Sequence, residues 1–299
     1  MMHKIVIIGA AGRMGKALIR SLLDKVVPGV QLAGAVDLAA CPEQGQDAGL
    51  AAGGPSAGLP ITADLAAAAA GCDAAVDFSF HQSAAAHAEQ FARWGKPLVI
   101  GTTGLTPAEQ QAVAQAARKV PIVLAPNMSL GVNLLLSLVR QTAAALRDRG
   151  FDVEIIERHH RRKKDAPSGT ALGLGAAAAE GYGWDLARTA VHGRTGLTGE
   201  RPEQQIGFHA VRGGDWVGDH TVIFAAEGES LELSHRATSR ATFALGALRA
   251  AAWVVGQPAG LYSMQDVLGL RSAQGPSGDG MGQPVTRAGR PSALESDAR

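Results

Sequence analysis

The residues best suited to acid–base chemistry stand together in the stretch IERHHRRKKDAPSGTA, residues 156–171. Histidine exchanges protons near neutral pH and lysine donates them, so a histidine and a lysine of this stretch can move protons on a bound molecule. The segment from Ser168 to Thr170 falls where a helix is expected to begin, so its amides and hydroxyls can bind a carboxylate. Together with the neighbouring cations, this segment predicts a receptacle for a small dicarboxylate.

Three other interpretations of this stretch compete with that one. A metal site is disfavoured because His159 and His160, adjacent on an expected strand, point to opposite faces, and no cysteine or carboxylate nearby has a familiar ligand spacing. A nucleic-acid patch is disfavoured because interleaved aromatic residues are missing and the net charge is only +1. A solvated charged turn is the usual meaning of a charge run, but the string DAPSGT directly after it favours anion binding.

A glycine-rich loop near the N-terminus predicts a dinucleotide site. The string GAAGRMG, residues 9–15, follows the apolar run Lys4–Ile8 and precedes residues with helical spacing. Glycines allow a tight turn there and let backbone amides approach a pyrophosphate at the helix N-terminus. Asp37 closes a second apolar run about 20 residues past the loop, where a carboxylate can bind ribose hydroxyls. A tight turn without a ligand is the alternative.

The residue after Asp37 bears on which dinucleotide is bound. Leu38 cannot pair with a 2′-phosphate, so the sequence favours NADH over NADPH, with Arg13 as a cation that could compensate.

Two further loops follow expected strands, GTTG at residues 101–104 and APNMS at residues 125–129. The carboxyl edge of an open α/β sheet is where ligands bind, so Thr102, Thr103 and Asn127 can supply polar groups near the nicotinamide. Ordinary turn chemistry is the alternative for either loop alone.

The composition bounds the class of protein. A chain of 299 residues with 46% hydrophobic residues is long enough for two domains. The N-terminal apolar run is shorter than the roughly 7–15 residue core of an export signal, and no run approaches the roughly 18–20 residues of a membrane span. We therefore expect a cytoplasmic protein without membrane or nucleic-acid partners, and Cys41 and Cys72 as reduced thiols.

The expected elements divide the chain after about residue 127. Before it, strands and helices alternate, as is typical of a doubly wound parallel sheet. The expected strands there are 4–8, 30–37, 74–79, 97–101 and 121–125, with helices from about 82 and 107, and 38–60 is a surface insertion. After it come a helix near 132–148, a strand at 152–158, a helix from about 170, sheet segments at 206–213, 217–226 and 229–237, and an amphipathic helix near 240–255.

Seven segments resemble the dihydrodipicolinate reductase family, in order over about residues 4–270. They are GAAGRMGKALI, VDFSF, IGTTGL, APNMSLGVNLLL, EIIERHHRRKKDAPSGTAL, GERPEQQIGFHAVRGGDWVGDHTVIF and LSHRATSRATFALGALRAAAWV. The resemblance implies a 4-hydroxy-tetrahydrodipicolinate reductase, which uses NADH or NADPH to form tetrahydrodipicolinate and water on the diaminopimelate route to lysine.

The resemblance also implies a two-domain α/β fold. Residues 1–129 are expected to form a Rossmann-like dinucleotide-binding domain with a doubly wound parallel sheet, completed by residues 241–271. Residues 130–240 are expected to form a smaller α+β domain with a mixed sheet, which binds the dicarboxylate substrate and builds a homotetramer. Residues 272–299 are expected to be a disordered tail.

Site residues are implied in the same way. His159 is expected to be the catalytic acid/base and Lys163 the proton donor. The substrate-carboxylate site is expected at His160, Lys163, Ser168, Gly169 and Thr170. Cofactor contacts are expected from Gly9, Ala10, Ala11, Gly12, Arg13, Met14, Asp37, Gly101, Thr102, Thr103, Ala125, Pro126, Asn127 and Met128. No metal ion is implied.

Two positions depart from the commoner family pattern, since Leu38 replaces a frequent arginine and Met128 a frequent phenylalanine.

The rival enzyme is another nicotinamide-dependent amino-acid or sugar dehydrogenase of the same architecture, which the string HHRRKKDAPSGT disfavours. A catalytically silent dinucleotide sensor is disfavoured by the presence of both His159 and Lys163. The string GPSAG, residues 54–58, fits a nucleophile-elbow pattern but has no strand before it, so we interpret it as coincidence.

Overall fold

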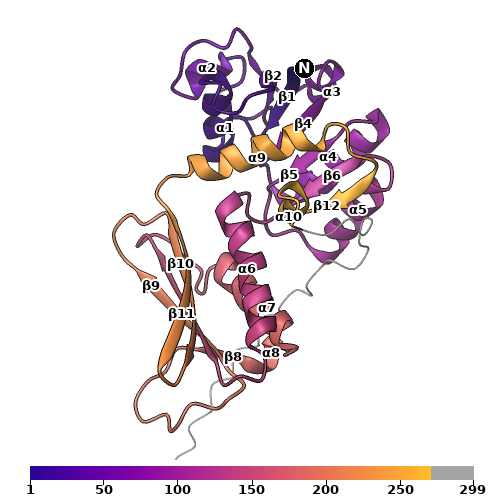
Figure 1. Ribbon diagram of the computed structural model, residues 1–299. Helices are drawn as coiled ribbons and strands as arrows, with labels where there is room; N and C mark the ends of the chain where they lie inside the picture. The colour runs from indigo at the N-terminus through magenta and orange to yellow at the C-terminus, as the bar shows by residue number, and fades with distance from the viewer. Residues whose placement is uncertain (271–299) are drawn as a thin grey trace, which may run out of the picture.

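The computed structural model describes residues 1–270, which form two sheets with helices packed on them (Figure 1). The predicted tail at 272–299 lies outside the described residues. The first sheet has seven parallel strands in the order β12-β6-β5-β4-β1-β2-β3. They are β1 (His3–Ile8), β2 (Val30–Val36), β3 (Ile61–Thr62), β4 (Ala74–Asp77), β5 (Leu98–Ile100), β6 (Pro121–Leu124) and β12 (Gly260–Tyr262).

Helices cover both faces of the first sheet. On one face lie α1 (Arg13–Leu23), α2 (Ala48–Ala51), α9 (Ala241–Val254) and α10 (Met264–Val267), and on the other lie α3 (Leu65–Ala70), α4 (His81–Trp94) and α5 (Pro107–Ala117). Because side chains alternate along a strand, Ile5 and Ile7 of β1 pack toward α1 and α9, while Val6 packs toward α4. Burial on both faces explains the unbroken apolar strands and confirms the predicted Rossmann-like sheet.

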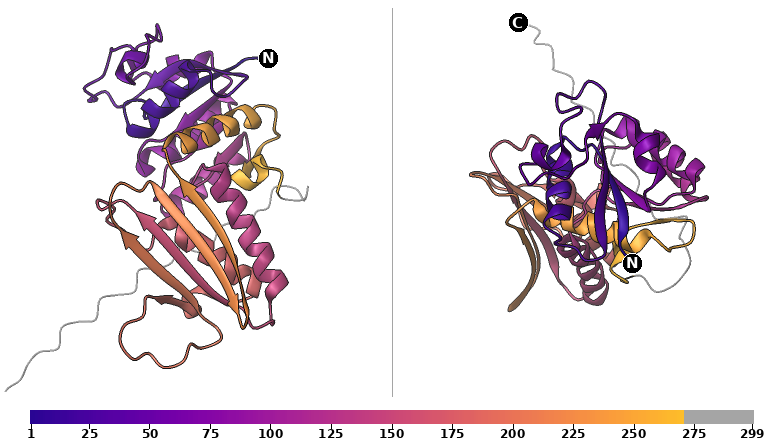
Figure 2. Two further views of the ribbon diagram at one scale, coloured as in Figure 1. Left: turned by 60° about the vertical axis from the view of Figure 1, so that its left-hand side comes forward. Right: turned by 90° about the horizontal axis from the view of Figure 1, so that it is seen from above.

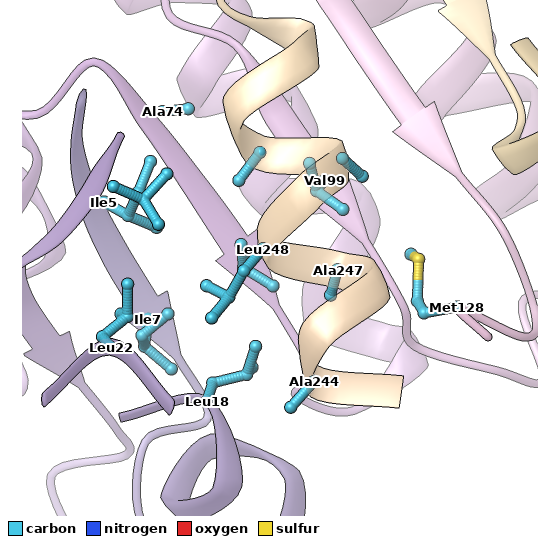
Figure 3. Packing of buried hydrophobic residues seen from close by; sticks show 14 of the residues in the cluster. Ile5, Ile7, Leu18, Leu22, Ala74, Val99, Met128, Ala244, Ala247 and Leu248 are labelled. Carbon is cyan, nitrogen blue, oxygen red and sulfur yellow. The ribbon is translucent and has the colours of Figure 1, made fainter. Parts of the chain in front are cut away.

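Helix α9 returns to the first sheet from the far end of the chain. Its buried residues Ala244, Ala247 and Leu248 pack in the same cluster as Ile5 and Leu18 (Figure 3). The helix lies where the sequence predicts one. The strand after it, β12, was not predicted, because three residues are too few to show a period.

The second sheet has five strands in the order β11-β10-β7-β9-β8. They are β7 (Asp152–His159), β8 (Ala190–His192), β9 (Ile206–Arg212), β10 (Gly218–Ala226) and β11 (Glu229–Ala237). Strand β9 runs parallel to β7 and β8, whereas β10 runs antiparallel to β7 and β11, so the sheet is mixed.

Helices α6 (Leu130–Leu146) and α7 (Gly169–Tyr182) cover one face of this sheet (Figure 2), and the short α8 (Leu186–Thr189) follows α7. The inward stripe of β7 begins with Val153 and Ile155 and continues as Glu157 and His159, which are buried too. Polar side chains thus take the core positions at the end of β7.

None of the helices within residues 1–270 combines the length and apolarity needed to span a bilayer.

The insertion between β2 and β3 is organised by one carboxylate. Asp47 accepts hydrogen bonds from the amides of Gly49, Leu50, Ala57 and Gly58 and from the Ser56 hydroxyl. These bonds, led by that from the Ala57 amide, hold the pKa of Asp47 well below its usual range. The serine of the GPSAG string therefore has a structural partner.

The close packing of α9 on the loop after β6 predicts a cost for adding one methyl group. A Cβ on Gly246 would lie 1.7 Å from the Met128 carbonyl oxygen, so the helix and the loop would have to separate. We expect Gly246→Ala to lower the free energy of unfolding by roughly 1–3 kcal/mol, measured by urea denaturation.

The matched control is Gly173→Ala in α7, whose added methyl would meet only Leu136 Cδ2, at 3.6 Å. That variant should be neutral or more stable by up to about 1 kcal/mol. Equal losses in the two variants would contradict this account of the contact.

Candidate active site

The carboxylate of Glu157 lies at the centre of the polar cluster that ends β7. The side chain is 1% exposed and accepts four hydrogen bonds. Its Oε2 lies 2.6 Å from His159 Nδ1, and its Oε1 accepts the Ser168 amide at 3.0 Å. Arg212 of β9 donates from Nη1 and Nη2 at 2.7 and 2.6 Å. One residue therefore joins β7, β9 and the start of α7.

These bonds set the charge of Glu157. Burial alone would raise its pKa, but hydrogen bonds from His159, Arg212 and the Ser168 amide outweigh burial and lower the pKa to about 2. A carboxyl with a lowered folded-state pKa stabilises the fold above its ordinary pKa of 4.5, and that stabilisation is lost as the pH falls toward 2. At neutral pH the group is a fixed negative charge.

Glu157 fixes which atom of His159 can do chemistry. Because Nδ1 is bound to the carboxylate, Nε2 is the ring atom left to exchange a proton. That atom lies against the backbone of β10, where a Cβ on Gly218 would come within 3.0 Å of it. The geometry is that of a carboxylate-oriented imidazole, a common arrangement for general acid–base work.

A second imidazole lies beside His159. The rings of His220 and His159 have centroids 5.2 Å apart, and His220 Nε2 lies 3.0 Å from the Ser168 hydroxyl oxygen. Burial, followed by the nearby His159, lowers the pKa of His220 to about 4, so the ring is neutral at pH 7. Sequence reasoning did not place His220 in the site, because its position beside His159 depends on the pairing of β10 with β7.

The basic loop after His159 is anchored at both ends. The His160 amide donates to the Trp216 carbonyl oxygen at 2.9 Å, and Arg212 Nη2 donates to the Asp165 carbonyl oxygen at 2.7 Å. Lys163 Nζ pairs with both Asp165 carboxylate oxygens, at 2.9 and 2.8 Å. The predicted proton donor is thus held close to the end of β7.

The imidazole of His160 differs from that of His159 in its surroundings. Burial, and then the cations Arg162 and Arg240, lower the pKa of His160, which favours a neutral ring near pH 7. Its Nδ1 is buried without a hydrogen-bond partner. A buried polar atom without a partner is unusual in a folded protein and is expected where a ligand binds.

The start of α7 is held by Ser168, one of the residues predicted to bind a substrate carboxylate. The residue is 2% exposed, its amide donates to Glu157 and its hydroxyl contacts His220 and caps the Ala171 amide. In this structure it therefore positions the helix. The exposed Gly169 and the half-buried Thr170 offer the next amides at the positive end of α7.

A cavity of about 660 Å³ lies at the predicted dinucleotide site. It is lined by Gly9, Ala11, Gly12, Asp37 and the segment from Leu38 to Glu43, and by Ile8, Val36, Ala63, Leu65, Phe78, Ser79, Phe80, Ser83 and His87. Its volume suits the adenosine half of a dinucleotide. None of the second group was predicted, because these residues come from separate segments that only the folded sheet brings together.

The glycine loop is shaped for a phosphate. Gly9 has φ +79°, and a Cβ on Gly15 would lie 2.1 Å from the Gly9 carbonyl oxygen, so both positions require glycine. Asp37 Oδ2 accepts the Ala11 amide at 2.8 Å and braces the loop. No side chain caps α1 at Gly12, which leaves its first amides available to an anion. These residues fit a bound pyrophosphate.

Several predicted cofactor residues have buried side chains. Ala10, Thr102, Ala125 and Met128 are between 0% and 6% exposed, and Met128 lies in the core beside α9 (Figure 3). Any contact they make with a cofactor in this conformation is through the backbone. The side chain of Met128 packs in the core beside α9, so in this conformation its backbone is the part of the residue that faces the predicted site.

Asn127 joins the two predicted halves of the site. Its Nδ2 donates to Thr170 Oγ1 at 3.0 Å, so a residue of the predicted cofactor loop touches the start of α7. Its Oδ1 accepts the Ser129 amide at 2.9 Å, which fixes the loop where α6 begins.

Within residues 1–270, no three side chains among His, Cys, Asp and Glu gather as metal ligands do.

A glycine-rich βα loop beside a nucleotide-sized cavity on a Rossmann-like sheet, together with a histidine–carboxylate cluster on a second sheet, is typical of a dinucleotide-dependent oxidoreductase. Comparisons with known proteins specify it further. The model described as "Dihydrodipicolinate reductase, N-terminus" matches residues 3–128, and that described as "Dihydrodipicolinate reductase, C-terminus" matches residues 131–268. The chain belongs to the dihydrodipicolinate reductase family, and it is an NAD(P)H-dependent oxidoreductase.

Similar proteins agree with this assignment. A 4-hydroxy-tetrahydrodipicolinate reductase from Anaeromyxobacter dehalogenans (strain 2CP-1 / ATCC BAA-258) is 53% identical over 273 residues, covering 91% of this chain and 100% of the relative. One from Thiobacillus denitrificans is 52% identical over 268 residues, covering 90% and 99%. The solved structure of dipicolinate-bound dihydrodipicolinate reductase from Paenisporosarcina sp. TG-14 has a TM-score of 0.70 at 24% identity, covers 89% of this chain and 99% of that chain, and has the same fold.

The bond between Glu157 and His159 predicts a catalytic cost for removing the carboxylate charge. Glu157→Gln removes the charge that holds the imidazole of His159 in place, so we expect turnover to fall by at least about tenfold. Steady-state kinetics of NADH oxidation measures this effect.

Glu154→Gln is the matched control. Glu154 lies on the same strand but on the opposite face, and it binds Arg194, Arg201 and His209 in place of His159. It should leave turnover within about twofold of the parent. Equal turnover in Glu157→Gln and the parent would refute the assigned role of the carboxylate.

Proposed function

We propose that the chain reduces 4-hydroxy-tetrahydrodipicolinate to tetrahydrodipicolinate and water, as a 4-hydroxy-tetrahydrodipicolinate reductase of lysine biosynthesis through diaminopimelate. Family membership supports the reaction. The observation that carries the assignment of the site is the contact between Asn127 and Thr170, which joins the cofactor loop to the carboxylate-binding end of α7. The relatives at about 50% identity disfavour the alternative of another amino-acid or sugar dehydrogenase.

The substrate is a cyclic dicarboxylate in this proposal. The structural relative from Paenisporosarcina is bound to dipicolinate, a ring with two carboxylates, and this supports the same ligand class here. The amides of Gly169 and Thr170 bind one carboxylate at the N-terminus of α7, and Lys163 and His160 contact the ring substituents from the basic loop. Ser168 acts by positioning that helix start.

The dinucleotide lies over the glycine loop. The first amides of α1 bind its pyrophosphate, and Asp37 binds the ribose next to the adenine. The bound nicotinamide supplies a hydride. We propose NADH as the preferred cofactor, because Leu38, 58% exposed at the cavity rim, offers no charge to a 2′-phosphate. No metal ion takes part in the proposed reaction.

His159 and Lys163 perform the proton transfers. Loss of water from the substrate gives a conjugated imine, whose carbon opposite the ring nitrogen accepts hydride. The resulting enamine-like anion takes a proton from Lys163 or His159 Nε2, and positioned acids of this kind accelerate a step by roughly 10²–10⁴-fold. Glu157 stabilises the protonated imidazole, and holding the ring in place supplies the geometry that hydride transfer requires.

The two sites belong to different parts of the chain. In this proposal, residues 1–129 with 241–271 bind the dinucleotide, and residues 130–240 bind the substrate and assemble a homotetramer in the cytoplasm. Closure about residues 127–130 and 240 brings the two ligands together. Exposed apolar residues on the second sheet, among them Val211 and Leu231, support burial against another subunit.

Replacement of Lys163 tests the proposed reaction. We expect Lys163→Ala to lower kcat by roughly 10²–10⁴-fold, because the positioned proton donor is lost. The measurement is NADH oxidation with the freshly made condensation product of pyruvate and aspartate semialdehyde.

Lys164→Ala, which removes an exposed cation one residue away, is the control and should stay within about twofold of the parent. A Lys163→Ala enzyme with a rate within a few-fold of the parent would show that Lys163 is not the donor.

A further inference from the structure

The wall of the nucleotide cavity beyond Asp37 is a fixed part of the site. The Gln44 side-chain amide donates to the carbonyl oxygens of Asp37 and Leu38, at 3.1 and 2.9 Å, and the Cys41 amide donates to the Leu38 carbonyl oxygen at 2.9 Å. These bonds hold the segment from Leu38 to Glu43 against the end of β2. The start of the insertion therefore shapes the cavity on the side of the ribose-binding carboxylate.

The charges on this wall are negative. Among the residues that line the cavity in the described part of the chain, Asp37 and Glu43 carry carboxylates and none is lysine or arginine. Lys16, on the helix that follows the glycine loop, is bound by its Nζ to Glu43 Oε1 at 2.9 Å. The Cys41 thiol lies 3.2 Å from the other Glu43 oxygen. The ammonium of Lys16 is thus paired within the protein.

The rim of the cavity is apolar. Leu38 and Phe80 line it and are 58% and 66% exposed, from the ends of two different strands. Exposed apolar side chains at the mouth of a cavity suit a flat aromatic base such as adenine. They supply no charge to a phosphate on the neighbouring ribose.

A 2′-phosphate would meet unfavourable electrostatics at this wall. Such a group carries close to two negative charges near neutral pH. Like charges brought together in a partly enclosed site repel each other, and a cation already bound to a carboxylate gives little compensation. A 2′-hydroxyl, by contrast, can donate to a carboxylate.

We propose that Glu43 makes this cavity selective for NADH over NADPH, by pairing with Lys16 and by adding a second carboxylate beside Asp37. The proposal rests on the proposed function in one respect, namely that the cavity takes a nicotinamide dinucleotide. Discrimination against the 2′-phosphate then depends on Glu43, a residue of the insertion, and on Lys16. The ion pair with Glu43 keeps the Lys16 ammonium away from the phosphate.

The test compares ADP-ribose with its 2′-phosphate by titration calorimetry, and NADH with NADPH by kcat/KM. Glu43→Gln should raise the preference for the phosphorylated form by about tenfold in both measurements, because one repulsion is lost and Lys16 is released to bind the phosphate. Adding Lys16→Met to that variant should reduce the gain, because only the lost repulsion then remains. Glu89→Gln removes an exposed carboxylate from α4 and should leave the ratio unchanged.

A ratio in Glu43→Gln within about twofold of the parent, in both measurements and with the fold intact by circular dichroism, would overturn the proposal. So would a gain in the double variant as large as that in Glu43→Gln. Failure of the proposed function gives a different result, namely a parent enzyme that binds ADP-ribose but oxidises neither cofactor with the substrate.

Discussion

Glu157 is a carboxylate buried beneath the second sheet, where an unpaired charge would cost several kcal/mol. The chain satisfies it with His159 from its own strand, Arg212 from β9 and the Ser168 amide from the start of α7. Each partner is thereby fixed in space. The same bonds that make the charge tolerable therefore orient the imidazole of His159, anchor the basic loop through Arg212 and set where α7 begins.

The second constraint is the link between the two parts of the chain. Helix α9 follows β11 of the second sheet in the chain and packs on the first sheet, with Gly246 against the backbone of Met128. Asn127, one residue earlier, contacts Thr170. The loop after β6 is thus held from both sides, so a shift of one part of the chain relative to the other changes the position of this loop.

Local patterns in the sequence were enough to predict the Rossmann-like sheet, the glycine loop with Asp37 and the importance of the stretch around His159. These depend on apolar periodicity and on residues close together in the chain. The burial of Ser168 and Met128 could not be read in this way, since it is set by Glu157 and by α9. Glu157 itself left a signal, because a residue two before His159 on a strand faces the same side. His220 left none before the pairing of β10 with β7 was known.

The central claim is that one cleft brings a reduced nicotinamide up to a dicarboxylate held by the basic loop and α7. A crystal structure with NAD⁺ and dipicolinate bound together tests it most directly. We predict one carboxylate on the amides of Gly169 and Thr170, His159 Nε2 and Lys163 Nζ facing the ring, and the nicotinamide within about 3–3.5 Å of it. A dicarboxylate bound away from α7, or a nicotinamide far from both side chains in the closed form, would contradict the account.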